Sequence, residues 1–202
     1  MIVDPEREDY RNIYRLMVGA IVPRPIAFVS TMSADGRLNL APFSFFTAIS
    51  ANPPVICFCP MVRGDSSYKD TLNNIRVTDE FVVNVVSEDF ASRMNVCSGE
   101  YPAGVDEFEK SGLTPVASDL VKPPRVLESR VNMECRLLRI VDVSAKPLGG
   151  SIVLGEVIRF HVSDEIFDNF KIDPDKLKPI GRMGGPTYTR TTDRFDMERP
   201  KV

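Results

Sequence analysis

The chain has 202 residues, of which 43% are hydrophobic and 26% charged, and its formal net charge is −3. This composition excludes a disordered chain, and the mixing of acidic with basic residues excludes the basic stripe of a nucleic-acid binder. No apolar run approaches the roughly 20 residues that span a bilayer, and no secretory leader is visible. We therefore expect a cytoplasmic protein, bound to neither nucleic acid nor membrane, with a single domain over 1–202.

The apolar periodicity is mostly that of strands rich in β-branched and aromatic residues. The runs 131–143 and 151–162 flank a turn signal at 147–150 and predict a hairpin, and Asp35-Gly36 predicts another turn. Since strands and helices do not alternate, we predict a mainly β fold with peripheral helices rather than a parallel sheet. The other predicted elements are helices at 5–17, 68–77 and 88–96, strands at 20–22, 26–29, 54–58 and 81–86, and short turns in 164–178.

The last part of the chain, from about 180 to 202, is an irregular polar arm. It carries three arginines, a tyrosine and three glycines between Gly181 and Phe195. Such a segment is either a loose tail or the cover of a ligand site.

The four cysteines are too few for a disulfide framework in a chain of this length, and a reducing cytosol would keep them as thiols. Cys57 and Cys59 stand two residues apart in an extended run, so both thiols point to one face, which suits a metal or redox pair. Without a second cysteine pair or a histidine nearby, core packing is favoured and no metal site is expected.

Several catalytic motifs are missing. The sequence has no dinucleotide fingerprint, no phosphate loop of the Walker type and no two-histidine zinc helix. A serine or cysteine hydrolase would have to use His161, the only histidine, and no serine has the context of a nucleophile elbow. With so few acids and bases of the right kind, a cofactor is expected to supply the chemistry.

One candidate site lies at 63–71. Ser67 and Asp70 have the spacing of a capping box, which predicts a helix from Tyr68 whose first N–H groups are free to bind an anion. Lys69 and Arg63 add positive charge, and hydroxyl donors come from Ser66 and Thr71. A phosphate would suit this segment, and so would a plain capped surface helix.

A second candidate site is the segment 39–50, where three phenylalanines stand among Asn39, Ser44 and Thr47. They would give a flat apolar wall with hydrogen-bonding edges, as a flavin ring requires. A barrel strand with polar residues facing outward produces the same pattern.

Three single residues are also notable. Arg24 lies between Pro23 and Pro25, which excludes a regularly paired central strand there. The segment is either a bulge that aims Arg24 into a ligand pocket or an edge-strand device for solubility. His161, on the polar face of its strand, either contacts a ligand or lies at the surface. Asn84, in an apolar run, is expected to be buried and bonded to the backbone.

Together these segments resemble the flavin reductase-like, FMN-binding split-barrel proteins. The resemblance spans most of the chain, and its specific parts are Ala-Pro-Phe-Ser-Phe-Phe at 41–46 and Lys-Asp-Thr at 69–71. It implies a six-stranded Greek-key split β-barrel that forms a homodimer, with FMN against the barrel near the dimer interface. The other resembling segments are 19–31, 35–40, 80–84, 155–157 and 181–185.

The resemblance also implies roles for the candidate residues. Asn39, Ser44, Phe45 and Thr47 would line the flavin ring or ribityl chain. The phosphate end would lie at the 63–71 segment, against Arg63, Ser66, Lys69, Asp70 and Thr71. Arg24, His161, Arg182 and Tyr188 are further candidates for cofactor contact.

Many relatives use NADH or NADPH to reduce the flavin by hydride transfer to the isoalloxazine, which needs no protein acid or base. His161 is the one candidate for such a group. We predict an NAD(P)H-dependent FMN oxidoreductase that supplies a monooxygenase or another electron acceptor. The alternatives are a tightly bound FMN electron-transfer protein that acts on another substrate or protein, and a non-catalytic flavin-binding protein.

Overall fold

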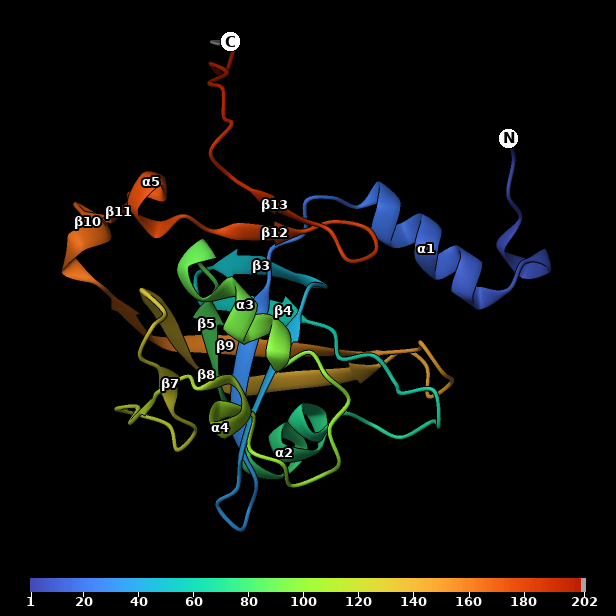
Figure 1. Ribbon diagram of the computed structural model, residues 1–202, viewed down its shortest axis with the longest axis horizontal. Helices are drawn as coiled ribbons and strands as arrows, with labels where there is room; N and C mark the ends of the chain where they lie inside the picture. The colour runs from blue at the N-terminus through green and yellow to red at the C-terminus, as the bar shows by residue number, and fades with distance from the viewer. Residues whose placement is uncertain (201–202) are drawn as a thin grey trace.

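The computed structural model describes residues 1–200. Its centre is a seven-stranded antiparallel sheet in the order β2-β1-β5-β8-β9-β4-β3 (Figure 1). The mainly β, antiparallel prediction is thus confirmed. The strands of this sheet are β1 (Ala27–Met32), β2 (Leu38–Phe43), β3 (Phe46–Ala51), β4 (Pro54–Phe58), β5 (Glu80–Val85), β8 (Val131–Asp142) and β9 (Ser151–Val162).

The sheet curls until its two edges meet. Its end strands are β2 and β3, and these follow each other directly in the chain with only Ser44 and Phe45 between them. A sheet whose end strands are joined by two residues is a barrel that stays unpaired along one seam. The strand count is seven rather than the expected six, because the chain bends at Ser44 and Phe45, and 38–51 becomes two strands that pair with different neighbours.

Both predicted turns are present. Gly36, with φ at 86°, lies in the turn that joins β1 to β2, a left-handed conformation that glycine adopts without strain. Strands β8 and β9 pair over most of their twelve residues each, and the turn between them contains Leu148 with a positive φ. This long hairpin forms much of the barrel wall (Figure 1).

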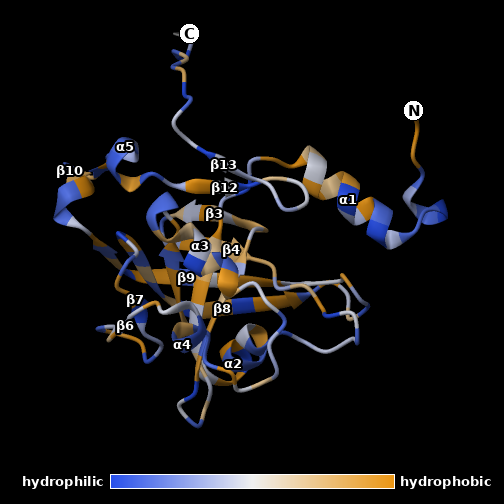
Figure 2. Ribbon diagram, viewed as in Figure 1, coloured by the Kyte–Doolittle hydropathy of each residue, from blue (hydrophilic) through white to orange (hydrophobic). Residues whose placement is uncertain are grey.

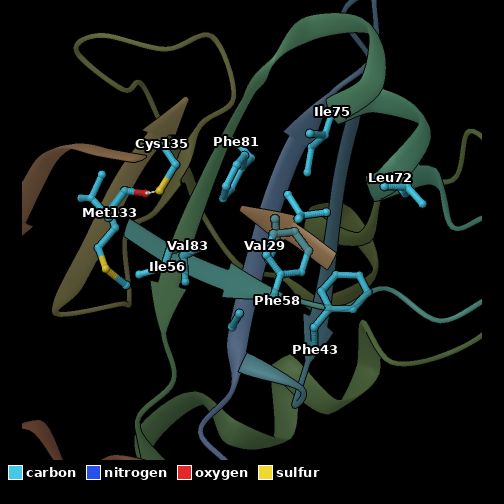
Figure 3. Close-up of a cluster of buried hydrophobic side chains, with 13 residues drawn as sticks. Val29, Phe43, Ile56, Phe58, Leu72, Ile75, Phe81, Val83, Met133 and Cys135 are labelled. Atoms are coloured by element: carbon cyan, nitrogen blue, oxygen red, sulfur yellow. Dashed lines mark hydrogen bonds between the residues drawn. The ribbon is translucent and has the colours of Figure 1, made fainter. Parts of the chain in front are cut away.

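The barrel interior is filled by aromatic and aliphatic side chains from all of its main strands (Figure 3). The ring of Phe58 lies 5.2 Å from that of Phe43 and 5.5 Å from that of Phe81, measured between centroids. At Gly155 a Cβ atom would stand 2.2 Å from the Phe81 ring, so glycine is required there. A second apolar cluster lies under the helices of 88–113 and includes Phe28 and Phe90.

Asn84 is fully buried, as predicted. Its side-chain amide donates to the carbonyl of Phe28 at 2.9 Å and accepts from the N–H of Val126 at 2.9 Å. Both polar ends are therefore satisfied, which removes the cost of placing an amide in the core.

The helices are short and lie outside the barrel, and α1 projects away from it (Figure 1). None of those within 1–200 has the length and apolarity to cross a membrane. Their bounds are η1 (Pro5–Arg7), α1 (Tyr10–Ala20), α2 (Asp70–Thr78), η2 (Glu88–Phe90), α3 (Ala91–Val96), α4 (Glu107–Ser111), η3 (Asp164–Ile166) and α5 (Pro174–Leu177).

Some predicted elements differ from the structure. The predicted strand 20–22 is wrong, because Ala20 ends α1 and the N–H of Ile21 donates to the carbonyl of Met17. The arm that was predicted to be irregular begins with a hairpin of β12 (Ile180–Arg182) and β13 (Tyr188–Arg190). Residues 201 and 202 of the arm lie outside the described residues. The remaining short strands are β6 (Pro115–Val116), β7 (Arg125–Val126), β10 (Phe167–Asp168) and β11 (Lys171–Ile172).

Candidate functional site

Two adjoining cavities lie beside strand β2. The larger has a volume of about 890 Å³ and is bounded by α1, the β12–β13 hairpin and loops of the barrel. The smaller, of about 90 Å³, lies at the beginning of α2. Pro42 and Ser98 line both cavities, so the two form one elongated site with its waist at these residues.

The larger cavity has a strongly one-sided charge. Four arginines line it, and no Asp or Glu stands among its lining residues within 1–200. The chain as a whole has more acidic than basic residues, so this concentration of positive charge is specific to the cavity. It favours an anionic ligand. The arginines are Arg11 and Arg15 of α1, Arg24, and Arg182 of β12.

Arg24 ties the walls of this cavity together. Its guanidinium donates to the carbonyls of Val18 and Ile21, both at 2.7 Å, and to the carbonyl of Met183 at 2.9 Å. It also donates to the hydroxyl of Ser44 at 3.3 Å. The segment from Pro23 to Pro25 forms no regular strand, as predicted. Arg24 is only 5% exposed, so it is not an edge-strand device for solubility. The buried charge is used to join α1, the β2–β3 corner and the β12–β13 hairpin.

Arg182 and Tyr188 form the hairpin's contribution. The two residues are paired across the hairpin, and the Arg182 guanidinium lies 4.5 Å from the centre of the Tyr188 ring, a cation–π contact. The Tyr188 hydroxyl donates to Asn95 Oδ1 of α3 at 3.0 Å. Tyr188 therefore links the hairpin to the barrel side of the cavity.

The smaller cavity has mixed charge. Lys69 precedes the first residue of α2, and Asp70 and Thr71 of the first turn line the cavity with it. Arg63 donates to the carbonyl of Tyr68 at 2.6 Å and pairs with Asp70 at 3.3 Å. Burial lowers the pKa of Lys69, and the neighbouring Arg63 lowers it further. Two cations at an open helix start favour an anion, whereas the carboxyls of Asp70, Glu100 and Glu107, which also line the cavity, oppose one.

Interior hydrogen bonds fix the walls of the smaller cavity. Asn39 donates through Nδ2 to the hydroxyl of Thr71 at 2.9 Å and to that of Thr31 at 3.2 Å. Glu107 of α4 accepts the N–H of Leu40 at 3.0 Å, and burial raises the pKa of its carboxyl. These bonds lock α2 and α4 onto strand β2.

The predicted capping box is wrong. Ser67 donates both its N–H and its hydroxyl to Asp65, at 2.9 and 2.6 Å, and α2 begins at Asp70 rather than at Tyr68. Asp65, two residues away, is the closer acceptor, and Arg63 engages the Asp70 carboxylate. The N-cap residue Lys69 makes no side-chain capping bond, so the open helix start that the prediction required is present two residues later.

The three phenylalanines do not form one flat wall. Phe43 at the end of β2 is buried in the barrel core and Phe46 at the start of β3 packs against that core, because the chain bends at Ser44 and Phe45 between them. Phe45, in the bend between the strands, lies beside the Arg24 guanidinium at 6.0 Å. Ser44 lines the larger cavity, whereas Thr47 is exposed on the edge strand β3.

His161 and Ser66 line neither cavity. Ser66 is exposed in the loop before α2, with φ at 67°. His161 on β9 makes a 2.6 Å contact between Nε2 and the carboxylate of Glu134, which is fully buried. Burial pushes the pKa of Glu134 upward, but the N–H groups of Asp119 and Leu120 and the His161 ring lower it more. In this chain His161 belongs to a buried polar network away from the two cavities.

Cys57 and Cys59 lie along and just after β4. Both are half-buried free thiols, and burial raises the pKa of each. A raised pKa keeps a thiol protonated and unreactive.

The wall contributed by α1 was not predicted from the sequence. Tyr10, Arg11, Tyr14 and Arg15 all line the larger cavity. Each tyrosine is followed by an arginine, and the two pairs stand four residues apart, which places all four side chains on one face of a helix. The sequence did contain this signal. Nothing in the sequence showed which side of the helix faces a ligand site.

Comparison with known proteins agrees with the fold. The family model described as the flavin reductase like domain matches residues 18–178, most of the chain. The chain belongs to the flavin reductase-like family. The matched region contains the whole barrel and both predicted blocks at 41–46 and 69–71.

Solved structures of this family are closely similar. Nitrilotriacetate monooxygenase component B from Bacillus cereus is 32% identical, with a TM-score of 0.93 over 98% of each chain. The 2-nitrobenzoate 2-nitroreductase NbaA from Pseudomonas fluorescens is 32% identical, with a TM-score of 0.89 over 99% of this chain and 96% of that one. A Shewanella frigidimarina protein named for its split barrel domain is 22% identical, with a TM-score of 0.84 over 99% and 100% of the two chains. The fold is therefore the split barrel of flavin reductases.

Proposed function

We propose that this protein is an FMN-binding oxidoreductase in which NADH or NADPH reduces the flavin. The observation that carries the proposal is the elongated site of two joined cavities, one at an open helix start and the other lined by arginines and tyrosines. A flavin nucleotide has this form, with a phosphate at one end and a broad ring at the other. When bound, it supplies the two-electron chemistry that the side chains of the site lack.

In this proposal the phosphate lies in the smaller cavity. Lys69 and Arg63 supply the positive charge, and the N–H groups of the first turn of α2 donate. Asn39 and Thr71 hold each other and fix the cavity wall. Asp70 keeps Arg63 in place, and Ser66 stands in the loop above.

The ring lies across the waist at Pro42, toward the larger cavity. Ser44 is held in place by Arg24, and Phe45 packs beside the same guanidinium at the β2–β3 corner. Thr47, exposed on β3, would reach the flavin only from outside the cavity. Arg182 and Tyr188 cover the cavity from the hairpin. Ser44→Phe is expected to abolish flavin binding by filling the ring position, and normal flavin content in this variant would show that the ring lies elsewhere.

The function is tested by anaerobic spectroscopy. Purified protein titrated with FMN should bind it, and NADH or NADPH should bleach the absorbance of the flavin. Bleaching by a photoreductant but by neither nucleotide would remove the nicotinamide donor and leave a flavin-binding protein. Protein without measurable FMN affinity would contradict the whole proposal.

A second candidate is favoured by the similarity to a nitroreductase. A flavin that stays bound through turnover would pass its electrons to a small substrate or a protein, whereas a reductase that serves a separate monooxygenase would release it. The similarity to a monooxygenase component B supports release. Gel filtration of the FMN-loaded protein separates the two candidates, because only a protein whose flavin stays bound through turnover retains it on the column.

We further propose that the protein is a homodimer. On α1, which projects from the barrel, Leu16 and Met17 are 52% and 44% exposed, and Val18 is the only buried residue of the helix (Figures 1 and 2). Ile21, the C-cap residue after the helix, is 56% exposed. An amphipathic helix requires cover for its apolar face. A second copy would provide it, and Leu16→Glu should then convert a dimer to a monomer in sedimentation analysis.

A further inference from the structure

The face of α1 toward the larger cavity is built from two tyrosines and two arginines. Tyr10, Arg11, Tyr14 and Arg15 line the cavity together with Val18. Residues four apart in a helix stand one turn apart on the same face, about 5–6 Å between Cβ atoms. Arg11 and Arg15 therefore extend side by side over the cavity, whereas Ile13, Leu16 and Met17 of α1 do not line it.

These two arginines are weakly engaged within the chain. Arg11 comes no closer than 3.9 Å to the carboxylate of Asp9, which already accepts the N–H at the helix start. Its guanidinium also lies 5.1 Å from the centre of the Tyr10 ring, a cation–π contact that leaves the N–H donors at its edge free. Arg15 donates to Asn12 at 3.3 Å and forms no ion pair within residues 1–200. Both residues are exposed.

The other two arginines of the cavity are already in use. Arg24 donates to three backbone carbonyls and is buried. Arg182 is stacked on Tyr188 and donates to the carbonyl of Gly185. The free positive charge of the cavity therefore belongs to α1, on the opposite side of the waist from the proposed phosphate position of the flavin.

A pair of free arginines is suited to a phosphate monoester. Each guanidinium presents several N–H donors in a planar fork that matches two phosphate oxygens. NADPH differs from NADH by one such group on the adenine ribose, which adds about 1.5–2 negative charges at pH 7. The ring of Tyr14 between the two arginines offers a flat surface for the adenine.

We propose that Arg11 and Arg15 bind the 2′-phosphate of NADPH and make it the preferred electron donor. This inference rests on the proposed use of a nicotinamide dinucleotide by the same site. It assigns a specificity role to α1, whereas the barrel and the β12–β13 hairpin hold the flavin.

The first test is binding without flavin and without turnover. The probes are 2′,5′-ADP, which carries the 2′-phosphate, and 5′-AMP, which lacks it, each titrated into the full chain by calorimetry. The wild type should bind 2′,5′-ADP at least tenfold more tightly than 5′-AMP, and Arg11→Gln/Arg15→Gln should abolish this difference. Arg7→Gln is the matched control, since Arg7 is exposed, pairs with Asp4 and lies outside the cavity. Equal affinity for the two probes in the wild type, or an unchanged double variant, would overturn the inference.

The second test is the KM of the FMN-loaded protein for each nucleotide. In the double variant the KM for NADPH should rise at least tenfold more than the KM for NADH. The melting temperatures of the double variant and of Arg7→Gln should equal that of the wild type. If both nucleotides reduce wild-type flavin equally well, the inference fails and the proposed function stands. If neither reduces it, the proposed function fails, and the 2′,5′-ADP titration still decides the site. Loss of FMN affinity in the double variant would instead assign the arginines to the flavin phosphate and overturn the inference.

Discussion

The two cavities of the site are held together in different ways. The smaller one is enclosed by strand β2 and helices α2 and α4, and internal bonds such as Asn39 to Thr71 fix its walls. The larger one lies between peripheral elements, α1 and the β12–β13 hairpin, and the bonds of one arginine join them. The proposed phosphate end is therefore built into the barrel, whereas the larger cavity depends on Arg24 to hold its walls together.

The largest expected effect follows from removing this joint. Arg24→Ala should destabilise the protein by about 4 kcal/mol, because one buried and two part-buried carbonyls lose a charged donor and each such bond contributes about 1.5–3 kcal/mol, not fully additively. Urea denaturation measures the change. Arg24→Lys keeps the charge but cannot reach three carbonyls and should fall between. A loss below about 1 kcal/mol would show that the walls hold without Arg24.

The buried pair of Glu134 and His161 lies outside both cavities and separates effects on stability from effects on ligand binding. Glu134→Gln should cost about 3 kcal/mol at pH 7, because it removes a fully buried charge held by two N–H groups and His161. Flavin affinity should not change, because Glu134 lines neither cavity. The exposed Glu109→Gln is the control.

This stabilisation should depend on pH. The folded-state pKa of Glu134 is lowered, so the carboxylate stabilises the fold above its unfolded pKa of about 4.3, and this contribution is lost as the pH falls through the lower folded pKa. The difference in unfolding free energy between wild type and Glu134→Gln should therefore shrink on acidification below about pH 4.3. A constant difference across this range would contradict the assignment.

At the smaller cavity, Lys69→Ala should weaken FMN binding by about 1.5–3 kcal/mol, the range for a hydrogen bond to a charged group. Riboflavin, which lacks the phosphate, should bind the variant and the wild type equally. Fluorescence titration measures both ligands, and the exposed Lys110→Ala is the matched control. Unchanged FMN affinity would place the phosphate outside this cavity.

The smallest effect is expected at the hairpin. Tyr188→Phe removes one solvent-exposed hydrogen bond, to Asn95, and should cost about 0.5 kcal/mol. For a chain of this size the melting temperature should fall by about 1–2 °C. A much larger fall in melting temperature would mean that the bond from Tyr188 to Asn95, like the bonds of Arg24, holds the walls of the larger cavity together.

Much of the barrel could be predicted from local patterns. Alternating apolar residues marked β8 and β9, and the turn at Gly36 needed a residue that tolerates positive φ. The strand predicted at 20–22 failed because β-branched residues also end helices, and Ile21 still bonds to the last turn of α1. The bend at Ser44 lies among phenylalanines and has neither glycine nor an Asn-Gly or Asp-Gly pair, so Pro42 and Ser44 alone did not separate β2 from β3.

The site was predictable only where its residues are neighbours in sequence. Arg63, Lys69 and Asp70 lie within eight positions, so their grouping was visible from the chain alone. The bond between Asn39 and Thr71, 32 residues apart, and the contact of Arg24 with Met183 depend on how the barrel closes. The role of α1 could not be read from the sequence for the same reason, since helical periodicity gives faces but not their neighbours.

The bond from Arg24 to the carbonyl of Met183 spans 159 residues. During synthesis the barrel strands, the last of which ends at Val162, leave the ribosome before the β12–β13 hairpin does. The smaller cavity is complete by then, but the larger one lacks a wall until residues 182–188 have emerged. A ligand that needs both ends of the site can consequently bind only after the hairpin has been synthesised. A polypeptide truncated before this hairpin would form a barrel whose larger cavity lacks one wall.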